Sequence, residues 1–432
     1  MRRIIPAALL AAFALIISAC KPDPIKLKAP VLDVTVDDES VIVTWTAVEN
    51  AATYAWKLDD GIESVTDQCT VQFELNAPEQ KFVVYVKALP ESAGYEESEW
   101  ASSEFVMPEA FLPLDAAGTA NCYVVTSAGK YSFDATTRGN EKEPALDPAS
   151  VEVIWSDKNI SDLISGDIIL KNGRVRFEAK DQPGNILLGV KAGNSSDEFI
   201  WSWHIWLAGG EISDETVKNA EGNTFTVMDR ALGAYAAKDD LNATLYQWGR
   251  KDPFSNTATV FVKGTESISS ETWYNVVDAM DNGIEYAIAH PDSFIKANNE
   301  NGSDWSNNDK SEGSKDWTLW YSIKSVYDPC PAGYRVPSPD TWTAMTSENG
   351  TWKTNGYIFP LENGQTSWYP AVGLRNSTDG KLRYYGEDGG YWSFQRYGTT
   401  NTACDYYLYS SSIWEDDNSV RAYAYAVRCV KE

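Results

Sequence analysis

Aromatic side chains that stand next to carboxylates are the residues of this sequence best suited to hold a ligand. An aromatic ring can stack on the apolar face of a sugar ring, while Asp, Asn and Arg side chains bind its hydroxyl groups. Ten of the 17 tryptophans fall within residues 209–432, several of them in stretches rich in Gly and Asp. The candidate ligand-binding residues are Trp368, Tyr369, Tyr384, Tyr385, Asp388, Trp392, Trp414 and Asp416. For each aromatic ring, packing in a core is the alternative interpretation.

Catalytic chemistry has little support in the residue types. The chain has two histidines, His204 and His290, so few side chains could act as a general base near neutral pH. Carboxylates are plentiful, and a glycan-degrading enzyme with a carboxylate pair is an alternative, but no motif selects two of them. His204 lies in the strand-like run 200–206, which favours a structural role. We therefore expect no enzymatic activity.

Cysteine spacing predicts one disulfide. Five cysteines follow Cys20, and an odd number means that at least one stays unpaired. In the run 328–333 (Asp-Pro-Cys-Pro-Ala-Gly), two prolines and a glycine fix a turn around Cys330, and we favour a bridge to Cys429. Cys69 and Cys122 stand in apolar, strand-like runs typical of buried thiols. The pairing of Cys69, Cys122 and Cys404 is left open.

The first twenty residues predict export and a lipid anchor. Two arginines precede the apolar run 4–17, which is too short to span a bilayer and suits a signal-peptide core. The run 17–20 (Ile-Ser-Ala-Cys) resembles the bacterial lipobox, which implies cleavage before Cys20 and lipid on its thiol. We expect a signal peptide over 1–19, a lipidated tether over 20–28 and an outer-membrane location at the cell surface; a chain that faces the periplasm is the alternative. The membrane is then a partner through the lipid on Cys20.

The overall charge limits the partners further. The net charge is −26, which disfavours nucleic acid and anionic membrane surfaces as ligands. With 43% hydrophobic residues, the chain can bury several cores.

Three β-rich segments must position the candidate residues. Residues 29–108 alternate in short runs, and the order of Ala29-Pro30, Val43-x-Trp45, Tyr54 and the run 82–88 resembles a fibronectin type III domain. Residues 109–208 predict a second β-sandwich. In its last run, period-two alternation places Trp201 and Trp203 on one face and Trp206 on the other. Core packing is the favoured interpretation of these tryptophans, and a sugar-stacking patch is the alternative.

Residues 209–432 carry separated motifs in a recognisable order. They are the runs 225–234, 245–254, 327–337, 390–393 and 426–430. Together these motifs resemble the major paralogous domain (FISUMP) family, which implies a mixed α/β, C-type lectin-like fold with short helices and long loops. Asp340-Thr341-Trp342 is expected to open such a helix. The predicted fold class is therefore multidomain and mainly β, with two β-sandwich (Ig/fibronectin type III-like) domains before the lectin-like domain.

A cofactor is not expected. The Asn- and Asp-rich run 298–316 lacks the EF-hand spacing of oxygen ligands. The run 305–309 (Trp-Ser-Asn-Asn-Asp) is only partly similar to the Trp-Asn-Asp triplet of lectin calcium sites. A solvated loop is expected there, and a calcium site is the alternative.

These observations predict a non-enzymatic surface binding protein, adhesin-like, for a glycan or glycoprotein ligand. The alternative is a structural accessory or tip subunit of a fimbria-like surface assembly, with other assembly subunits as partners.

Overall fold

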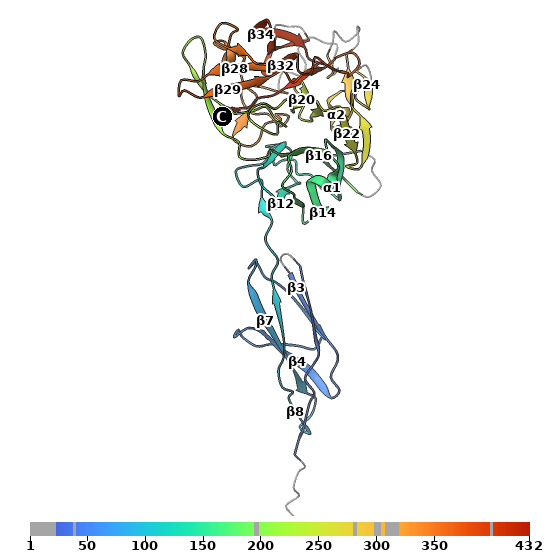
Figure 1. Cartoon of the computed structure of the whole chain (residues 1–432). Coiled ribbons are helices and arrows are strands. Elements are labelled where there is room, and N and C mark those ends of the chain that lie inside the picture. The colour runs from blue at the N-terminus through green and yellow to red at the C-terminus, as the bar shows by residue number, and fades with distance from the viewer. Residues whose placement is uncertain are drawn as a thin grey trace, which may run out of the picture. The chain divides into compact units, whose positions relative to one another are not determined.

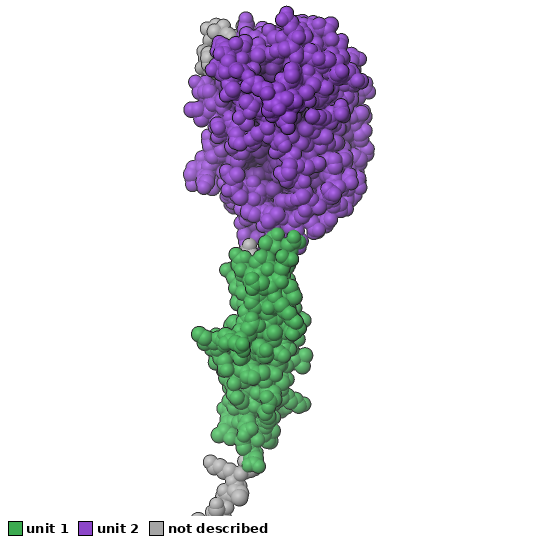
Figure 2. All heavy atoms as spheres, turned by 60° about the vertical axis from the view of Figure 1, so that its left-hand side comes forward, with its two compact units in different colours: residues 1–110 green, residues 111–432 purple. Residues whose placement is uncertain are grey.

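The computed structural model describes residues 23–37, 40–193, 198–279, 283–297, 304–306, 319–397 and 401–432. The chain divides into two compact units, unit 1 up to Ala110 and unit 2 from Phe111 to Glu432 (Figure 1, Figure 2). The predicted signal peptide and Cys20 lie outside the described residues. No helix among the described residues is both long and apolar enough to cross a membrane.

Unit 1 is a β-sandwich. One sheet has the strand order β2-β3-β6 and the other β5-β4-β7-β9, and β1 pairs with β8 beside them. The strands are β1 (Ile25–Lys26), β2 (Leu32–Val36), β3 (Ser40–Trp45), β4 (Ala51–Leu58), β5 (Ser64–Thr66), β6 (Thr70–Glu74), β7 (Lys81–Pro90), β8 (Tyr95–Glu96) and β9 (Ala101–Val106). Alternation explains the core, because Val41, Val43 and Trp45 of β3 are buried while Thr44 is exposed. The predicted fibronectin type III-like sandwich agrees with this arrangement.

Unit 2 begins with two sheets that enclose a core of their own. One has the order β10-β12-β15-β14 and the other β11-β17-β16-β13-β22-β23. Their strands are β10 (Leu112–Pro113), β11 (Cys122–Val125), β12 (Gly129–Asp134), β13 (Ser150–Ser156), β14 (Ile164–Lys171), β15 (Arg174–Ala179), β16 (Gly184–Lys191), β17 (Trp201–Leu207), β22 (Thr259–Val262) and β23 (Glu266–Ser269). Trp201 and Trp203 pack in this core, and Trp206 packs on the opposite side of the sheet. The tryptophans of β17 are therefore core residues, as favoured from the sequence.

The second of these sheets crosses the boundary expected between residues 109–208 and 209–432. Strand β13 pairs on one side with β16 and on the other with β22, where Trp155 lies opposite Val262. A hydrophobic cluster also joins Cys122 and Trp206 to Trp248. Because a sheet and a core are shared, the structure does not divide these segments into separate compact units, and residues 111–432 form one.

The rest of unit 2 is built from short strands. The largest sheet runs β21-β20-β35-β32-β33-β34, with β30 and β31 attached at β35; the others run β18-β19-β36-β26, β24-β25 and β27-β28-β29. The strands are β18 (Asp214–Lys218), β19 (Thr224–Met228), β20 (Thr244–Gln247), β21 (Phe254–Ser255), β24 (Val276–Asp278), β25 (Phe294–Lys296), β26 (Tyr334–Arg335), β27 (Thr351–Trp352), β28 (Gly356–Pro360), β29 (Thr366–Pro370), β30 (Leu374–Arg375), β31 (Leu382–Arg383), β32 (Asp388–Tyr397), β33 (Thr402–Tyr409), β34 (Ser412–Val420), β35 (Ala424–Ala426) and β36 (Val430–Lys431).

Helices are few and short among the described residues. They are α1 (Ile160–Leu163), α2 (Ile284–Ala289) and the 3-10 helix η3 (Pro339–Trp342). The short helix expected at Asp340-Thr341-Trp342 is thus present as η3. A mainly β, multidomain fold is confirmed (Figure 1).

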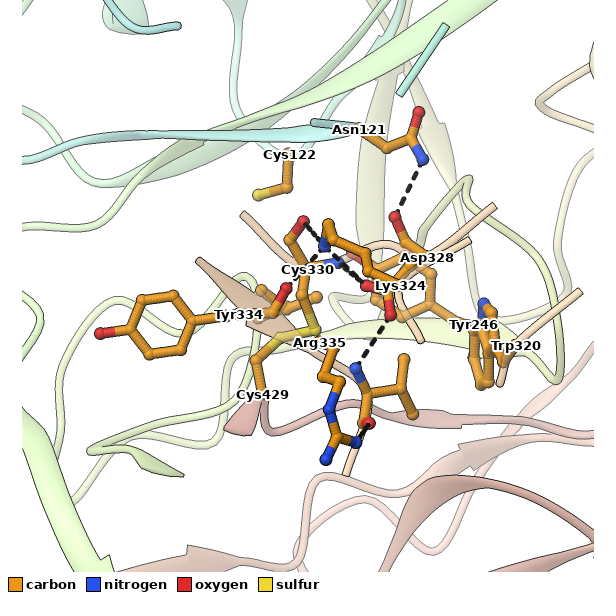
Figure 3. Close-up of a disulfide and its surroundings, with 12 residues drawn as sticks. Asn121, Cys122, Tyr246, Trp320, Lys324, Asp328, Cys330, Tyr334, Arg335 and Cys429 are labelled. Carbon is orange, nitrogen blue, oxygen red and sulfur yellow. Dashed lines mark hydrogen bonds and ion pairs between the residues drawn. A yellow bond between two sulfur atoms is a disulfide. The ribbon is translucent and has the colours of Figure 1, made fainter. Parts of the chain in front are cut away.

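The disulfide between Cys330 and Cys429 is present, with the two Cα atoms 6.0 Å apart (Figure 3). Both cysteines are fully buried. Next to the bridge, β26 pairs with β36 through Arg335 and Val430, so the cross-link fastens the end of the chain to the turn at 328–333. Cys69, Cys122 and Cys404 are free thiols.

A buried aspartate shapes the turn that carries Cys330. The carboxylate of Asp328 accepts hydrogen bonds from the backbone N–H of Cys330 (2.8 Å) and of Val336 (3.0 Å), and it pairs with the ammonium of Lys324 at 3.0 Å (Figure 3). The Lys324 ammonium also donates to the carbonyl oxygens of Cys330 and Tyr334. Each charge is therefore compensated within the turn.

Replacing Asp328 with alanine is expected to lower the free energy of unfolding of unit 2 by about 3–5 kcal/mol, because the buried Lys324 ammonium and two N–H groups lose their acceptor. Urea unfolding of the whole chain measures the loss. The matched control is Asp167→Ala, which removes an exposed carboxylate of the same unit and should cost less than about 0.5 kcal/mol. Equal costs for the two variants would contradict the role of Asp328.

Candidate functional site

The candidate site is a cleft of about 380 Å³ on the largest sheet of unit 2. Its walls come from β32, β33, β34 and β35 and from the segment around β30 and β31. The lining residues are Leu374, Asn376, Tyr384, Asp388, Tyr407, Tyr409, Trp414, Asp417, Ser419, Tyr423 and Tyr425. We call this site the aromatic cleft, because most of its wall is aromatic.

Strand alternation and register bring the rings together. In β33, Tyr406 and Leu408 point into the core, so Tyr407 and Tyr409 face the other side. Strand β34 pairs with β33 such that Trp414 lies opposite Tyr407. The register shifts between Asp405 and Tyr407, a bulge of the kind that re-aims side chains at sites.

The rings form a continuous aromatic surface. The Trp414 ring stacks on Tyr407 with centroids 5.8 Å apart and an angle of 25°, and Tyr409 meets it edge-on at 5.3 Å. Tyr425 lies 6.0 Å from Tyr407 and stacks on Tyr423 at 5.7 Å. Trp414 keeps 48% of its surface exposed although its neighbours hold it in place. A ring fixed on one side and open on the other is suited to stack on a flat ligand.

Two carboxylates stand among the rings. The Asp388 carboxylate accepts a hydrogen bond of 2.7 Å from the Tyr407 hydroxyl. Burial, with the bond and charge of Asp388 added, raises the pKa of Tyr407, so its hydroxyl remains protonated and donates. Asp417 lines the cleft from β34. The cleft can therefore offer carboxylate acceptors to ligand hydroxyl or amine groups.

A third aspartate, Asp405, is buried next to the cleft. It lies directly opposite Asp417 in the β33–β34 ladder and is 1% exposed. Neither of its carboxylate oxygens makes a hydrogen bond of normal geometry with the described residues. Burial, followed by the charge of Asp417, raises the pKa of Asp405 well above its usual range, and the nearby Ser419 offsets part of this rise. A buried carboxyl without a matched partner is costly to the fold, which marks it as a candidate functional group.

Replacing Asp405 with asparagine is expected to stabilise unit 2 more at about pH 8 than at about pH 4. The raised pKa of Asp405 means that the folded protein holds this proton more tightly than the unfolded chain does. The resulting stabilisation is complete below the unfolded-state pKa and is lost as the pH rises through the folded-state pKa, whereas asparagine has no such loss. Urea unfolding at the two pH values measures the difference, and Asp167→Asn should show no pH-dependent gain. A gain that is equal at both pH values would contradict the buried carboxyl as its source.

The structure brings some of the predicted ligand-binding residues together. Tyr384, Asp388 and Trp414 line the aromatic cleft. Asp416 is exposed and, with Trp414, Glu415 and Asp417, lines a neighbouring depression that shares two residues with the cleft. Tyr385 is 44% exposed beside Tyr384 but does not line the cleft.

The remaining three predicted residues belong to the core. Trp368, Tyr369 and Trp392 are 7%, 0% and 0% exposed. The Trp392 indole N–H donates to the carbonyl oxygen of Tyr246, and the Arg428 guanidinium lies 4.1 Å from the centre of the Tyr369 ring. Since their ring faces are covered by the protein, they are not available to stack on a ligand.

Sequence reasoning did not select Tyr407, Tyr409, Tyr423 and Tyr425. The alternation of Tyr407 and Tyr409 around the apolar Leu408 was the available signal, since it predicts a strand with tyrosines on one face. Tyr425 joins them only because β35 lies beside β32 in the sheet. That pairing could not be read from spacing along the chain.

A second group of reactive residue types lies in the core of unit 2. The Cys122 thiol is 3.5 Å from Nδ1 of His204, and Nε2 of His204 lies 2.8 Å from the amide oxygen of Asn185. Burial lowers the pKa of His204 to about 3 and raises the pKa of the Cys122 thiol. With all three residues buried, this group is a structural network, which agrees with the role expected for His204. Within the described part of the chain, His, Cys, Asp and Glu form no cluster of three or more that could hold a metal ion.

Of the comparisons with known proteins, only the one with solved structures found similar proteins. Protein-family models give no match, and neither do curated proteins. An FN3tt variant is 19% identical, with 19% of this chain and 98% of that chain covered and a TM-score of 0.17. The fn3 domain of the human collagen alpha-1(XX) chain is 20% identical over 22% of this chain and 96% of its own, with a TM-score of 0.18. A carbohydrate-binding module of the β-sandwich superfamily is 12% identical, with 48% of this chain and 78% of that chain covered and a TM-score of 0.19. This chain is thus similar in part to fibronectin type III domains and to β-sandwich carbohydrate-binding modules.

Proposed function

We propose that this protein is a non-enzymatic surface protein that binds a glycan, free or on a glycoprotein, through the aromatic cleft. The observation that carries the proposal is Trp414, which is half exposed, fixed by Tyr407 and flanked by the carboxylates of Asp388 and Asp417. Exposed aromatic rings that cluster in a cleft are typical of binding surfaces, where the face of a tryptophan packs against the partner. Carboxylates next to it supply the acceptors that orient sugar hydroxyl groups.

The proposal extends to location and family. The lipobox-like run that ends at Cys20 supports a lipid-anchored lipoprotein. We propose that it is held in the outer membrane at the cell surface, with unit 1 as a spacer. The motifs at 225–234, 245–254 and 327–337 support membership of residues 209–432 in the FISUMP family with a C-type lectin-like fold. We propose that binding needs no cofactor.

A role as an accessory or tip subunit of a fimbria-like assembly is the second candidate. Strand β34 ends the largest sheet and could accept a strand from another subunit by β-augmentation. However, its Glu415-Asp416-Asp417 run is charged, a feature that protects sheet edges from such pairing. Glycan binding is therefore the favoured function.

A glycan array tests the proposal. The chain from residue 21 onward is applied to immobilised glycans next to the Trp414→Ala variant, after circular dichroism has shown that both are folded. We expect the natural chain to bind a subset of glycans and the variant to lose those signals. The proposal fails if a folded natural chain binds no glycan at high concentration, or if the variant binds the same glycans equally well.

A further inference from the structure

The charged side chains that line the aromatic cleft are all negative. Its lining contains Asp388 and Asp417 but no Lys, Arg or His side chain. The adjoining depression adds the carboxylates of Glu415 and Asp416, and Asp405 lies buried opposite Asp417. An anionic ligand would therefore meet several like charges and no cation to neutralise it.

The aromatic rings of the cleft also favour a cationic ligand over an anionic one. Ring faces carry negative electrostatic potential and attract a cation placed within about 6 Å. Trp414, Tyr407 and Tyr425 form a connected wall with centroid separations of 5.8 and 6.0 Å. The Asp388 carboxylate is joined to this wall through the Tyr407 hydroxyl at 2.7 Å, so the negative groups and the rings belong to one surface.

The buried Asp405 bears on how much negative charge the cleft carries. It lies directly opposite Asp417 in the β33–β34 ladder, and its burial and the charge of Asp417 raise its pKa. The raised pKa of Asp405 favours its neutral form, so the negative charge that faces a ligand comes from Asp388 and Asp417 of the lining.

We propose that the glycan bound by this protein carries a free amine, as in an N-deacetylated amino sugar, and that its ammonium group is held by Asp388, Asp417 and the aromatic wall. The inference rests on the proposed function, because it takes the aromatic cleft to be the glycan site. The sugar ring stacks on the open face of Trp414 while the ammonium meets the carboxylates. Acetylated and acidic sugars are discriminated against, since an acetamide carries no positive charge and a sugar acid is repelled.

Two oligosaccharides that differ only in the amine test the inference. Calorimetric titration of the chain from residue 21 onward compares glucosamine tetramer with N-acetylglucosamine tetramer. We expect the glucosamine tetramer to bind at least about tenfold more tightly. Raising the salt concentration should weaken binding of the glucosamine tetramer more than binding of the acetylated tetramer.

The variant Asp417→Asn keeps the shape of the side chain and removes its charge. This variant should have about tenfold lower affinity for the glucosamine tetramer and unchanged affinity for the acetylated tetramer. The control Glu348→Gln removes one negative charge from an exposed position outside the cleft lining and should change neither of the two affinities. Equal affinity of the natural chain for both tetramers, or an Asp417→Asn effect matched by Glu348→Gln, would overturn the inference.

The two proposals fail separately. Binding of neutral or acidic glycans that is lost in Trp414→Ala, without a preference for the amine, overturns the amine assignment and leaves the proposed function standing. An absence of binding to every glycan overturns both. Binding of a polylysine peptide together with no response to the glucosamine tetramer also overturns the sugar assignment.

Discussion

The double variant Cys330→Ala/Cys429→Ala is expected to lose about 3–5 kcal/mol of unfolding free energy in unit 2. The bridge spans a sequence separation of 99 residues, and closing a loop of about 100 residues contributes about 4.7 kcal/mol in the chain-entropy model. Both cysteines are buried, so packing is lost as well. Urea unfolding followed by tryptophan fluorescence and circular dichroism measures the effect.

Unit 1 supplies the internal control for this experiment. It is a separate compact unit without a disulfide among its described residues, so its own unfolding transition should not shift. A reducing agent should destabilise unit 2 of the natural chain by the part of this loss that comes from the cross-link, and it should leave the double variant unchanged. If the reducing agent affects both proteins equally, the bridge is not the source of the stability.

The variant Trp414→Ala is expected to reduce affinity for the bound glycan at least about thirtyfold, which corresponds to about 2 kcal/mol. The Trp414 ring is 48% exposed and stacks on Tyr407, so its removal takes away an open ring face and also uncovers the face of Tyr407. Folding should be little affected, since Trp414 is 48% exposed. Calorimetric titration with the strongest glycan from the array gives the affinity.

The matched control is Tyr397→Ala. Tyr397 is 48% exposed, lies at the other end of β32 from Asp388 and does not line the cleft. Its removal should leave glycan affinity unchanged. Similar losses from both variants would indicate a general effect of removing surface aromatic residues and would argue against the cleft.

Local patterns predicted much of the fold. Alternating runs located β3, β4 and β7, and the prolines and glycine around Cys330 located the turn at one end of the disulfide, because these features depend on residues close in sequence. Neighbouring charges within two of the motifs also pair with each other: Asp229 with Arg230 at 2.7 Å and Lys251 with Asp252 at 2.6 Å.

The candidate site was predicted less completely, for a physical reason. Trp392 and Trp414 both stand near Gly and Asp in the sequence, yet Trp392 is buried and Trp414 is exposed. The difference arises because Trp392 lies in an inner strand of the sheet and Trp414 lies in its last strand. Burial of an aromatic ring depends on which strands pair, and pairing joins residues far apart in the chain.

The sheet that β13 shares with β22 also bears on how such a protein can arise by gene recombination. A crossover near residue 208 would separate β13 from its neighbour, leave Trp155 without its partner Trp273, and expose a row of unpaired backbone groups. A crossover near residue 110 would break no sheet. An exchange of sequence between genes is therefore expected to preserve the fold when it falls near residue 110 and to disrupt it when it falls near residue 208.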